Sequence, residues 1–194
     1  AFIDLSALAH NLGVVRQYVP CSRIMAVVKA DAYGHGLLHT ASALKDVDGF
    51  ALLELDAAIS LRDAGYQQPI LLLEGFFSTE ELALFEQYRL SAVIHHSEQI
   101  AMLSDSKHHN LDLFLKINTG MNRLGLAPEQ FPQIMKALTD HPGIDSITLM
   151  THFASADDPL EEDEVFQQLQ YFEAITQNHK YPHSLANSAA IMRY

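Results

Sequence analysis

Short apolar runs recur along the chain and are separated by longer segments in which apolar residues recur at helical spacing. The first run, at 24–29, has five successive apolar residues before a lysine. Runs without polar alternation are typical of strands buried on both faces. Similar runs follow at 49–53, 70–73, 90–94, 111–117, 144–150 and 183–185. We predict helices at 37–44, 55–64, 97–103, 128–138, 162–177 and from about 78, where STEE resembles a capping box.

The order of these elements indicates a parallel α/β fold. The opening residues predict a short strand at 2–5, then a helix capped by Asp4 or Ser6. Strands that alternate with helices through short, right-handed connections form either a barrel or an open doubly wound sheet. A dinucleotide-binding sheet would carry a GxGxxG turn after its first strand, and the sequence has none there.

The first apolar run ends in Lys29, followed by a loop with Tyr33, Gly34, His35 and Gly36. Ligands of parallel α/β folds bind at the carboxyl ends of the strands. An ammonium at an apolar strand end is costly to desolvate, which favours the neutral, nucleophilic amine. The functional interpretation is a Schiff-base lysine, and the structural one is a lysine that extends its charge to water.

Four motifs then occur in order: AVVKADAYGHG around Lys29, MNRLG at 121–125, THFASAD at 151–157 and ANSAA at 186–190. Together they resemble the signature of alanine racemases, which depend on pyridoxal phosphate. The resemblance implies an eight-stranded (β/α)8 barrel with the cofactor at its carboxyl-end mouth. It also implies that Lys29 forms the Schiff base and that Tyr33 reaches the phosphate.

The resemblance assigns roles to five further residues. Arg123 would bind the cofactor's phenolic oxygen and the substrate carboxylate, since a guanidinium suits both anions. Lys116 is a possible carbamylated lysine that orients Arg123. His152 would pack on the cofactor ring. Asn187 and Ser188 would meet the phosphate at a helix start, although from the residues alone they are an ordinary N-cap.

The implied activity is the interconversion of L-alanine and D-alanine, which supplies D-alanine for peptidoglycan precursors. By resemblance, Lys29 is the base for one face of the substrate, and a tyrosine from a second subunit's β domain serves the other. Family members are homodimers, and that tyrosine lies beyond Tyr194. The alternatives are a non-catalytic pyridoxal-phosphate-binding barrel, a racemase of larger amino acids, or a related decarboxylase.

The number of units is smaller than a closed barrel requires. About seven strand and helix units are predicted, the last only begun, against eight. We therefore expect one partial barrel domain over 1–194, corresponding to the N-terminal portion of the family. We also expect the chain to be inactive alone and to need a partner or the remaining portion, because open sheet edges promote association.

Composition narrows the partners and the compartment. The formal net charge of −12 disfavours nucleic acid and anionic membranes. Cys21 is the single cysteine, so no intrachain disulfide is possible, and no stretch reaches the length of a membrane span. These features predict a cytoplasmic protein.

Neither a histidine cluster nor an acidic cluster predicts a metal site. The pairs His95–His96 and His108–His109 are adjacent in sequence and do not converge as i, i+4 pairs do. The acidic residues at 157–164 lack the spacing of a calcium loop and predict a solvated helix start.

Overall fold

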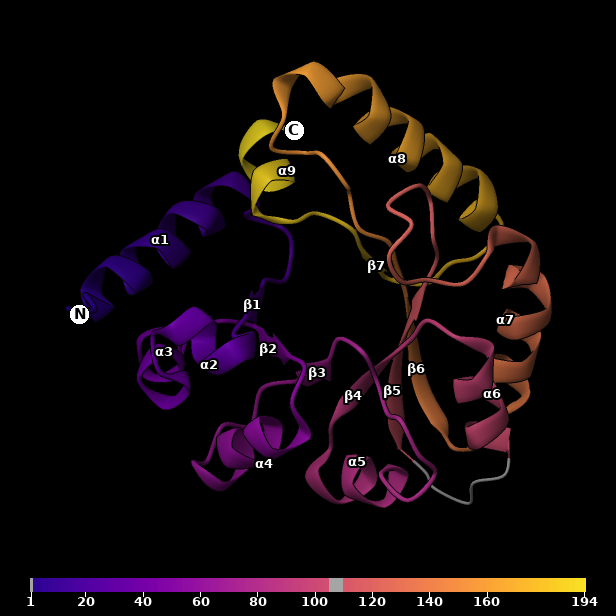
Figure 1. Cartoon of the computed structure of the whole chain (residues 1–194), viewed down its shortest axis with the longest axis horizontal. Helices are drawn as coiled ribbons and strands as arrows, with labels where there is room; N and C mark the ends of the chain where they lie inside the picture. Colours follow the sequence, from indigo (N-terminus) through magenta and orange to yellow (C-terminus); the bar gives the residue numbers. More distant parts are fainter. Residues whose placement is uncertain (1, 105–109) are drawn as a thin grey trace.

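The fold is a curled, all-parallel sheet covered by helices on its outer face. The structure is a computed structural model and describes residues 2–104 and 110–194. Its strands lie side by side in chain order (Figure 1). They are β1 Met25–Val27, β2 Gly49–Leu52, β3 Ile70–Leu72, β4 Ser91–Ile94, β5 Leu111–Lys116, β6 Ile144–Met150 and β7 His183–Ser184. Each neighbouring pair is parallel, as the apolar runs predict.

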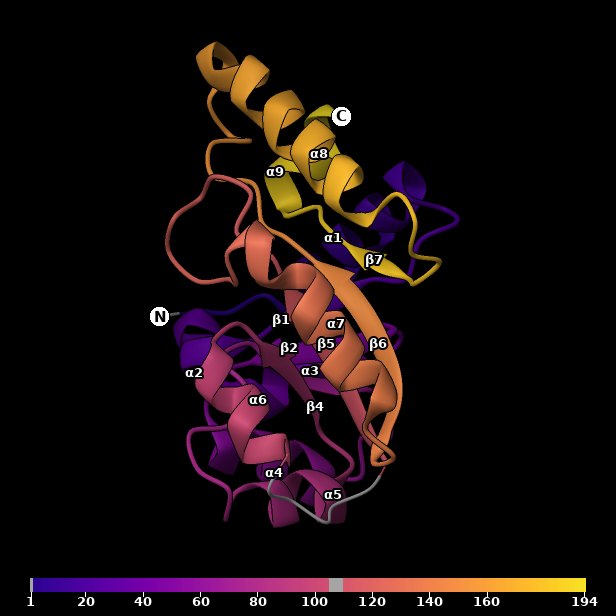
Figure 2. The ribbon, with the colours of Figure 1, turned by 90° about the vertical axis from the view of Figure 1, so that its right-hand side faces the viewer.

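Helices α2 to α8 connect successive strands, α1 precedes β1 and α9 follows β7, and together they surround the sheet (Figures 1 and 2). They are α1 Leu5–Tyr18, α2 Lys29–Gly34, α3 Leu37–Ala43, α4 Leu55–Asp63, α5 Leu82–Tyr88, α6 Ser97–Ser104, α7 Phe131–Asp140, α8 Glu162–Thr176 and α9 Ser188–Arg193. Short 3₁₀ turns at Pro128–Gln130 and Pro159–Glu161 precede α7 and α8.

Alternate strand residues form two separate apolar clusters. Phe50 and Leu52 belong to the main core, which also contains helix residues such as Phe85. Ala51 points the other way and joins a smaller cluster with Leu71 and Val93. Burial on both faces explains why the strands lack polar alternation.

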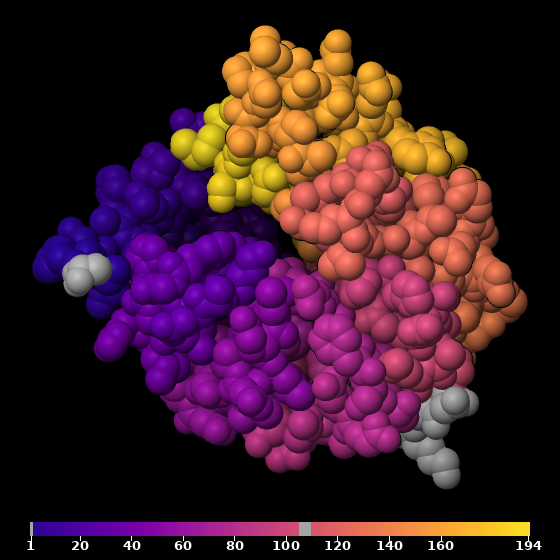
Figure 3. Space-filling view, viewed as in Figure 1, coloured from indigo at the N-terminus to yellow at the C-terminus, as the bar shows by residue number. Residues whose placement is uncertain are grey.

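The sheet curls without closing among the described residues. β1 and β7 are its two edges, and no pairing joins them in the described part of the chain. On the outside, α1 contacts α9 and so links the first and last elements. Figure 3 shows a recess between the N-terminal segments, in indigo and purple, and the later segments, in orange and yellow. The predicted partial barrel of seven strands is confirmed.

Two local predictions are wrong. Residues 2–4 form no strand; instead the Asp4 carboxylate accepts hydrogen bonds from the Ser6 and Ala7 amides and caps α1. The helix predicted from 78 begins at Leu82. The capping-box glutamate, Glu81, accepts from the Phe77 amide, so the preceding residues form a turn.

Among the described residues, no helix has both the length and the apolar character needed to cross a membrane.

Candidate active site at the carboxyl ends of the strands

The segment after β1 presents Lys29 from an unusual backbone turn. Ala30 to Tyr33, which make up most of α2, all have positive φ, between 52° and 56°, so this element is a left-handed turn and not a regular α-helix. For residues with a Cβ, this conformation costs about 1–2 kcal/mol each. Several hydrogen bonds hold it: the Asp31 carboxylate accepts from the Leu37 amide at 2.7 Å, and the Glu54 carboxylate accepts from the Ala30 amide at 3.3 Å. Lys29 is half-buried, whereas Tyr33 is 59% exposed.

Lys116 is a buried cation at the end of β5. Lys116 is 7% exposed. Burial lowers the pKa of its amine, and the charges of Arg123 and Lys29 lower it further. The neutral amine is therefore more accessible than on a surface lysine.

The effect of the Lys29 charge on the pKa of Lys116 reflects the curl of the sheet. In a flat sheet, the ends of β1 and β5 would lie about 19 Å apart, at about 4.8 Å per strand spacing. Because the sheet curls, the charge of Lys29 still acts on Lys116 and on His152. Groups far apart in sequence thus share one mouth.

Arg123 extends from a loop that is closed by its own hydrogen bonds. The Asn118 amide donates to Leu126 O at 3.0 Å, and the Leu126 amide donates to Lys116 O at 2.9 Å. A Cβ on Gly125 would lie 2.7 Å from Asn118 N, and its φ is +133°, so only glycine fits there. The Arg123 side chain is exposed.

His152 follows β6 and is half-buried. Burial lowers its pKa to about 4, with further lowering by Lys116, Arg123 and Lys29. The ring is therefore neutral at pH 7, which suits packing against an aromatic ligand better than holding a proton.

Asn187 and Ser188 begin α9, next to the segment that carries His152. The Asn187 amide oxygen accepts from the Ala190 amide at 3.0 Å, and its nitrogen donates to Phe153 O at 3.2 Å. Asn187 is therefore the N-cap of α9, and it also holds the segment that follows β6. The Ser188 side chain is exposed at the same helix start.

His95 belongs to this neighbourhood, although the sequence predicted only that its pair with His96 forms no metal site. It follows β4, and its Nε2 lies 3.0 Å from Glu74 O. Burial lowers its pKa, and the charge of Lys116 contributes. The expectation of no metal site remains a prediction; no group of three metal-ligating side chains converges within the described ranges, and His108 and His109 lie outside them.

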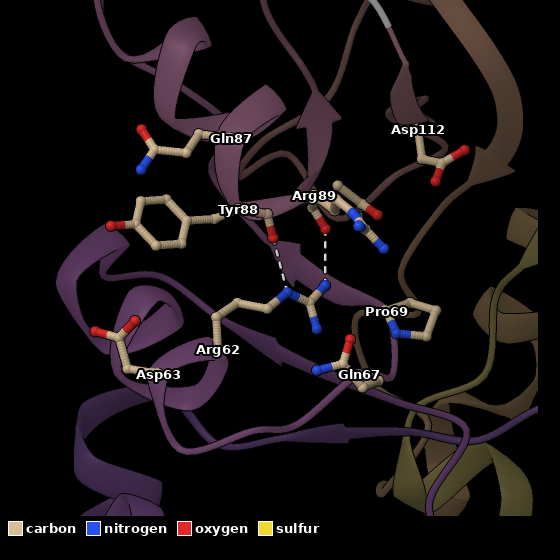
Figure 4. A pocket seen from close by; sticks show the side chains of 9 residues that line it. Arg62, Asp63, Gln67, Pro69, Gln87, Tyr88, Arg89 and Asp112 are labelled. Atoms are coloured by element: carbon tan, nitrogen blue, oxygen red, sulfur yellow. Dashed lines mark hydrogen bonds between the residues drawn. The ribbon is translucent and has the colours of Figure 1, made fainter.

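The candidate site residues and the larger cavity lie at opposite ends of the sheet. A narrow hollow with no room for a water molecule is lined by Lys116, His152 and the Arg123 loop. A larger cavity, of about 380 Å³, is lined by Arg62, Arg89 and Asp112 near the amino ends of the strands (Figure 4). There Arg62 donates to the carbonyl groups of Tyr88 and Arg89.

Comparisons with known proteins identify the family of the chain. The family model described as the N-terminal domain of alanine racemase matches residues 3–194. The chain belongs to the alanine racemase family. It is 57% identical over 195 residues to the alanine racemase of Nitrosospira multiformis and 46% identical over 193 residues to the catabolic alanine racemase of Klebsiella aerogenes.

Solved structures show the same fold. The biosynthetic alanine racemase of Pseudomonas aeruginosa matches 97% of the chain with a TM-score of 0.89 and 40% identity. A histidine racemase from Leuconostoc mesenteroides matches 96% with a TM-score of 0.83 and 29% identity. The chain spans about half the length of these relatives, 55% of the Nitrosospira multiformis racemase and 53% of the Pseudomonas aeruginosa racemase.

Proposed function

We propose that this protein acts in the racemisation of alanine with pyridoxal phosphate, and that residues 1–194 are the cofactor-binding barrel domain. The observation that carries the proposal is the meeting of Lys29, Lys116, Arg123 and His152 at one end of the curled sheet. The charges of Lys29 and Arg123 act there on Lys116, and all three cations act on the neutral His152 ring, although three separate segments supply the four residues.

The charge of this mouth fits the cofactor and the substrate. The chain has a formal net charge of −12, yet three cationic side chains gather here. No ion pair between described residues includes Lys29, Lys116 or Arg123. A phosphate, a phenolic oxygen and an amino-acid carboxylate are the anions that such a set can accept.

Each residue has a role in this proposal. When bound, pyridoxal phosphate withdraws the electrons left when the α-proton departs. Lys29 would hold the cofactor through its amine and move the proton on one face of the α-carbon. Arg123 would orient the substrate carboxylate, and the neutral His152 ring would pack on the cofactor. Tyr33 and Ser188 would donate to the phosphate, with Asn187 fixing the start of α9.

Lys116 is proposed as the site of a carbamate. Its lowered pKa favours the neutral amine. That amine adds to CO₂, loses one proton and becomes an anion. Such an anion would pair with Arg123 and replace the repulsion between two cations by attraction. Mass spectrometry of the intact protein under CO₂ is the direct measurement.

A second subunit completes the proposal. Racemisation needs a second proton-transfer group on the opposite face, and a tyrosine from the partner in a homodimer would serve. A cytoplasmic location, supported by the single exposed cysteine, and supply of D-alanine for peptidoglycan precursors belong to the same proposal.

The test is cofactor trapping in the full-length protein. We expect that borohydride reduction after incubation with pyridoxal phosphate places the cofactor's mass on the Lys29 peptide. Lys29→Arg is the control, since it keeps the charge without a nucleophilic amine. Labelling elsewhere, or none in a folded protein, would contradict the proposal.

The match to a histidine racemase, at 29% identity, makes a racemase of larger amino acids the second candidate, although the higher identities to alanine racemases do not favour it. Exchange of the α-proton with deuterium separates the possibilities. Exchange confined to alanine supports the proposal, exchange in larger amino acids supports the second candidate, and no exchange in the cofactor-loaded protein indicates a non-catalytic binder.

A further inference from the structure

Gln168 of α8 contacts two of the segments that carry candidate site residues. The residue is 4% exposed, which is unusual for a glutamine, and it lies on the buried face of α8 with Val165, Phe172 and Thr176. Its amide nitrogen donates to Thr119 Oγ1 at 3.3 Å, in the Arg123 loop, and to His152 O at 3.1 Å. Its amide oxygen accepts from the Ala154 amide at 2.9 Å.

We propose that Gln168 is a positioning residue that sets the Arg123 loop against the His152 segment. The proposal deepens the proposed function and rests on it. Gln168 itself lies behind the site and acts through the two loops. Neither the four motifs nor their resemblance to racemases pointed to it.

The hydrogen bonds around Gln168 form a chain with one direction. Thr151 Oγ1 donates to Ile117 O at 3.0 Å, so its proton is already used. Thr119 must therefore donate to Thr151 Oγ1, 2.7 Å away, and receives its own hydrogen bond from Gln168. All three side chains are buried. Replacing one of them by an apolar side chain would therefore leave a buried polar group of another without its hydrogen bond.

The chemistry of the amide explains why glutamine fits this position. Ala154 requires an acceptor, whereas His152 O and Thr119 Oγ1 take donors. A glutamate could accept from Ala154 but could not make both donations. An apolar residue of the same size could make none of the three.

Close packing at Gly120 adds a second constraint. A Cβ on Gly120 would lie 3.3 Å from Gln168 Cγ, and its φ is +140°. The loop therefore lies directly on the Gln168 side chain, three residues before Arg123. A change in the Gln168 side chain would displace the loop, and a shift of about 1 Å in a site can cost about 100-fold in rate.

The first experiment compares Gln168→Met and Gln168→Glu in the full-length protein loaded with pyridoxal phosphate. Gln167→Glu is the matched control, because Gln167 is exposed on the same helix. We expect kcat/KM for alanine to fall about 10-fold to 100-fold in both Gln168 variants and to stay within about 2-fold in the control. Both KM and kcat should change, since Arg123 meets the substrate.

Hydrogen exchange provides a readout that is independent of activity. The Ala154 amide should exchange at least about 10-fold faster in Gln168→Met, which lacks the acceptor. It should remain protected in Gln168→Glu, which keeps one. The 117–126 loop should exchange faster in both.

A second pair of variants covers the case in which Gln168 variants fail to fold. Thr119→Val removes the hydroxyl between Gln168 and Thr151, and Thr119→Ser keeps it. The proposal predicts a loss of activity in the valine variant and recovery in the serine variant. Equal activity in the two would overturn it.

The outcomes also separate this proposal from the function it rests on. Folded Gln168 variants with kcat/KM within about 2-fold of the unmodified protein would overturn the positioning role. If the unmodified protein neither binds pyridoxal phosphate nor racemises an amino acid, the proposed function fails, and the positioning role for that site fails with it, whereas the exchange pattern still tests the hydrogen-bond network.

Discussion

Two arginines at opposite ends of the sheet have opposite environments. At the amino ends, Arg62 donates to the carbonyl groups of Tyr66, Gln68, Tyr88 and Arg89. At the carboxyl ends, Arg123 is exposed on its loop, and its charge lowers the pKa values of Lys116 and His152. The guanidinium of Arg62 is already bound to backbone carbonyl groups, whereas that of Arg123 is available to a ligand.

The contrast shows that cavity size does not identify the site. The larger hollow is lined by an arginine that already binds its own backbone (Figure 4). The smaller one is lined by Lys116, whose pKa is lowered by the charges of Arg123 and Lys29, and an anion bound beside Lys116 would relieve that repulsion. In parallel barrels, the carboxyl ends carry function and the amino ends stability.

The largest expected effect is at Lys29. Lys29→Ala should lower racemase activity by at least about 1,000-fold, because it removes both the cofactor's attachment and a proton-transfer group. Steady-state assays of the full-length protein measure this. Lys136→Ala is the control: Lys136 is an exposed lysine that pairs with Asp140, and activity should not change. Comparable losses in both variants would contradict a specific role for Lys29.

A paired substitution tests the contrast between the two arginines. Arg62→Met should lower the free energy of unfolding by about 3 kcal/mol, because four backbone carbonyl groups lose a charged donor. Arg123→Met should leave it unchanged within about 0.5 kcal/mol, since the side chain is exposed. Urea titrations measure both.

Activity should show the reverse pattern. Arg123→Met should lower kcat/KM by about 100-fold or more, through loss of the contact with the substrate carboxylate. Arg62→Met should keep its activity per folded molecule. If Arg123→Met unfolded and Arg62→Met lost activity while folded, the functional and structural ends would be reversed.

The sequence predicts most of the fold because the strands are apolar on both faces. The parallel order and all seven strands follow from these runs. The strand predicted at 2–5 was wrong because the Asp4 carboxylate accepts hydrogen bonds from the Ser6 and Ala7 amides and so begins α1 at Leu5. The helix start near 78 was wrong because Glu81 accepts from Phe77, one turn before α5.

The candidate site is only partly visible in the sequence. Lys29, Arg123 and His152 stand within recognisable motifs, and the fold brings them together. Gln168 and Thr119 carry no motif, since their importance depends on how α8 crosses the two loops. Likewise, the left-handed turn after Lys29 contains ordinary residues at 30–33 whose conformation depends on Asp31 and Glu54.

The cofactor-free protein should lose stability at low pH through His152. Its pKa is about 4 when folded and about 6.5 when unfolded, so the unfolded chain binds more protons between these values. Its contribution is complete above pH 6.5 and falls as the pH drops to 4, by about 2 kcal/mol once solvent screening of the half-buried ring is allowed for. His152→Phe should remove this part of the pH dependence in urea titrations.

At the amino ends of the strands, the loss of stability on substituting Arg62 should not depend on pH. Arg62 keeps its charge throughout this range, so Arg62→Met should lower stability by the same amount at about pH 4.5 and about pH 7. A parallel pH dependence in the unmodified protein and His152→Phe would show that other groups account for the acid sensitivity.

The smallest expected effect is the difference in stability between alanine substitutions at two glycines, Gly65 and Gly125. Gly65 follows α4 near the amino-end cavity, with φ +92° and open space where an alanine Cβ would lie, so Gly65→Ala should cost about 1 kcal/mol from backbone strain alone. Gly125→Ala should cost about 2 kcal/mol or more, because its Cβ would also meet Asn118 N at 2.7 Å. Only Gly125→Ala should also lower activity, since it opens the loop that carries Arg123. Equal costs in stability, with no effect on activity, would mean that the closure between Asn118 and Leu126 does not hold Arg123 in place.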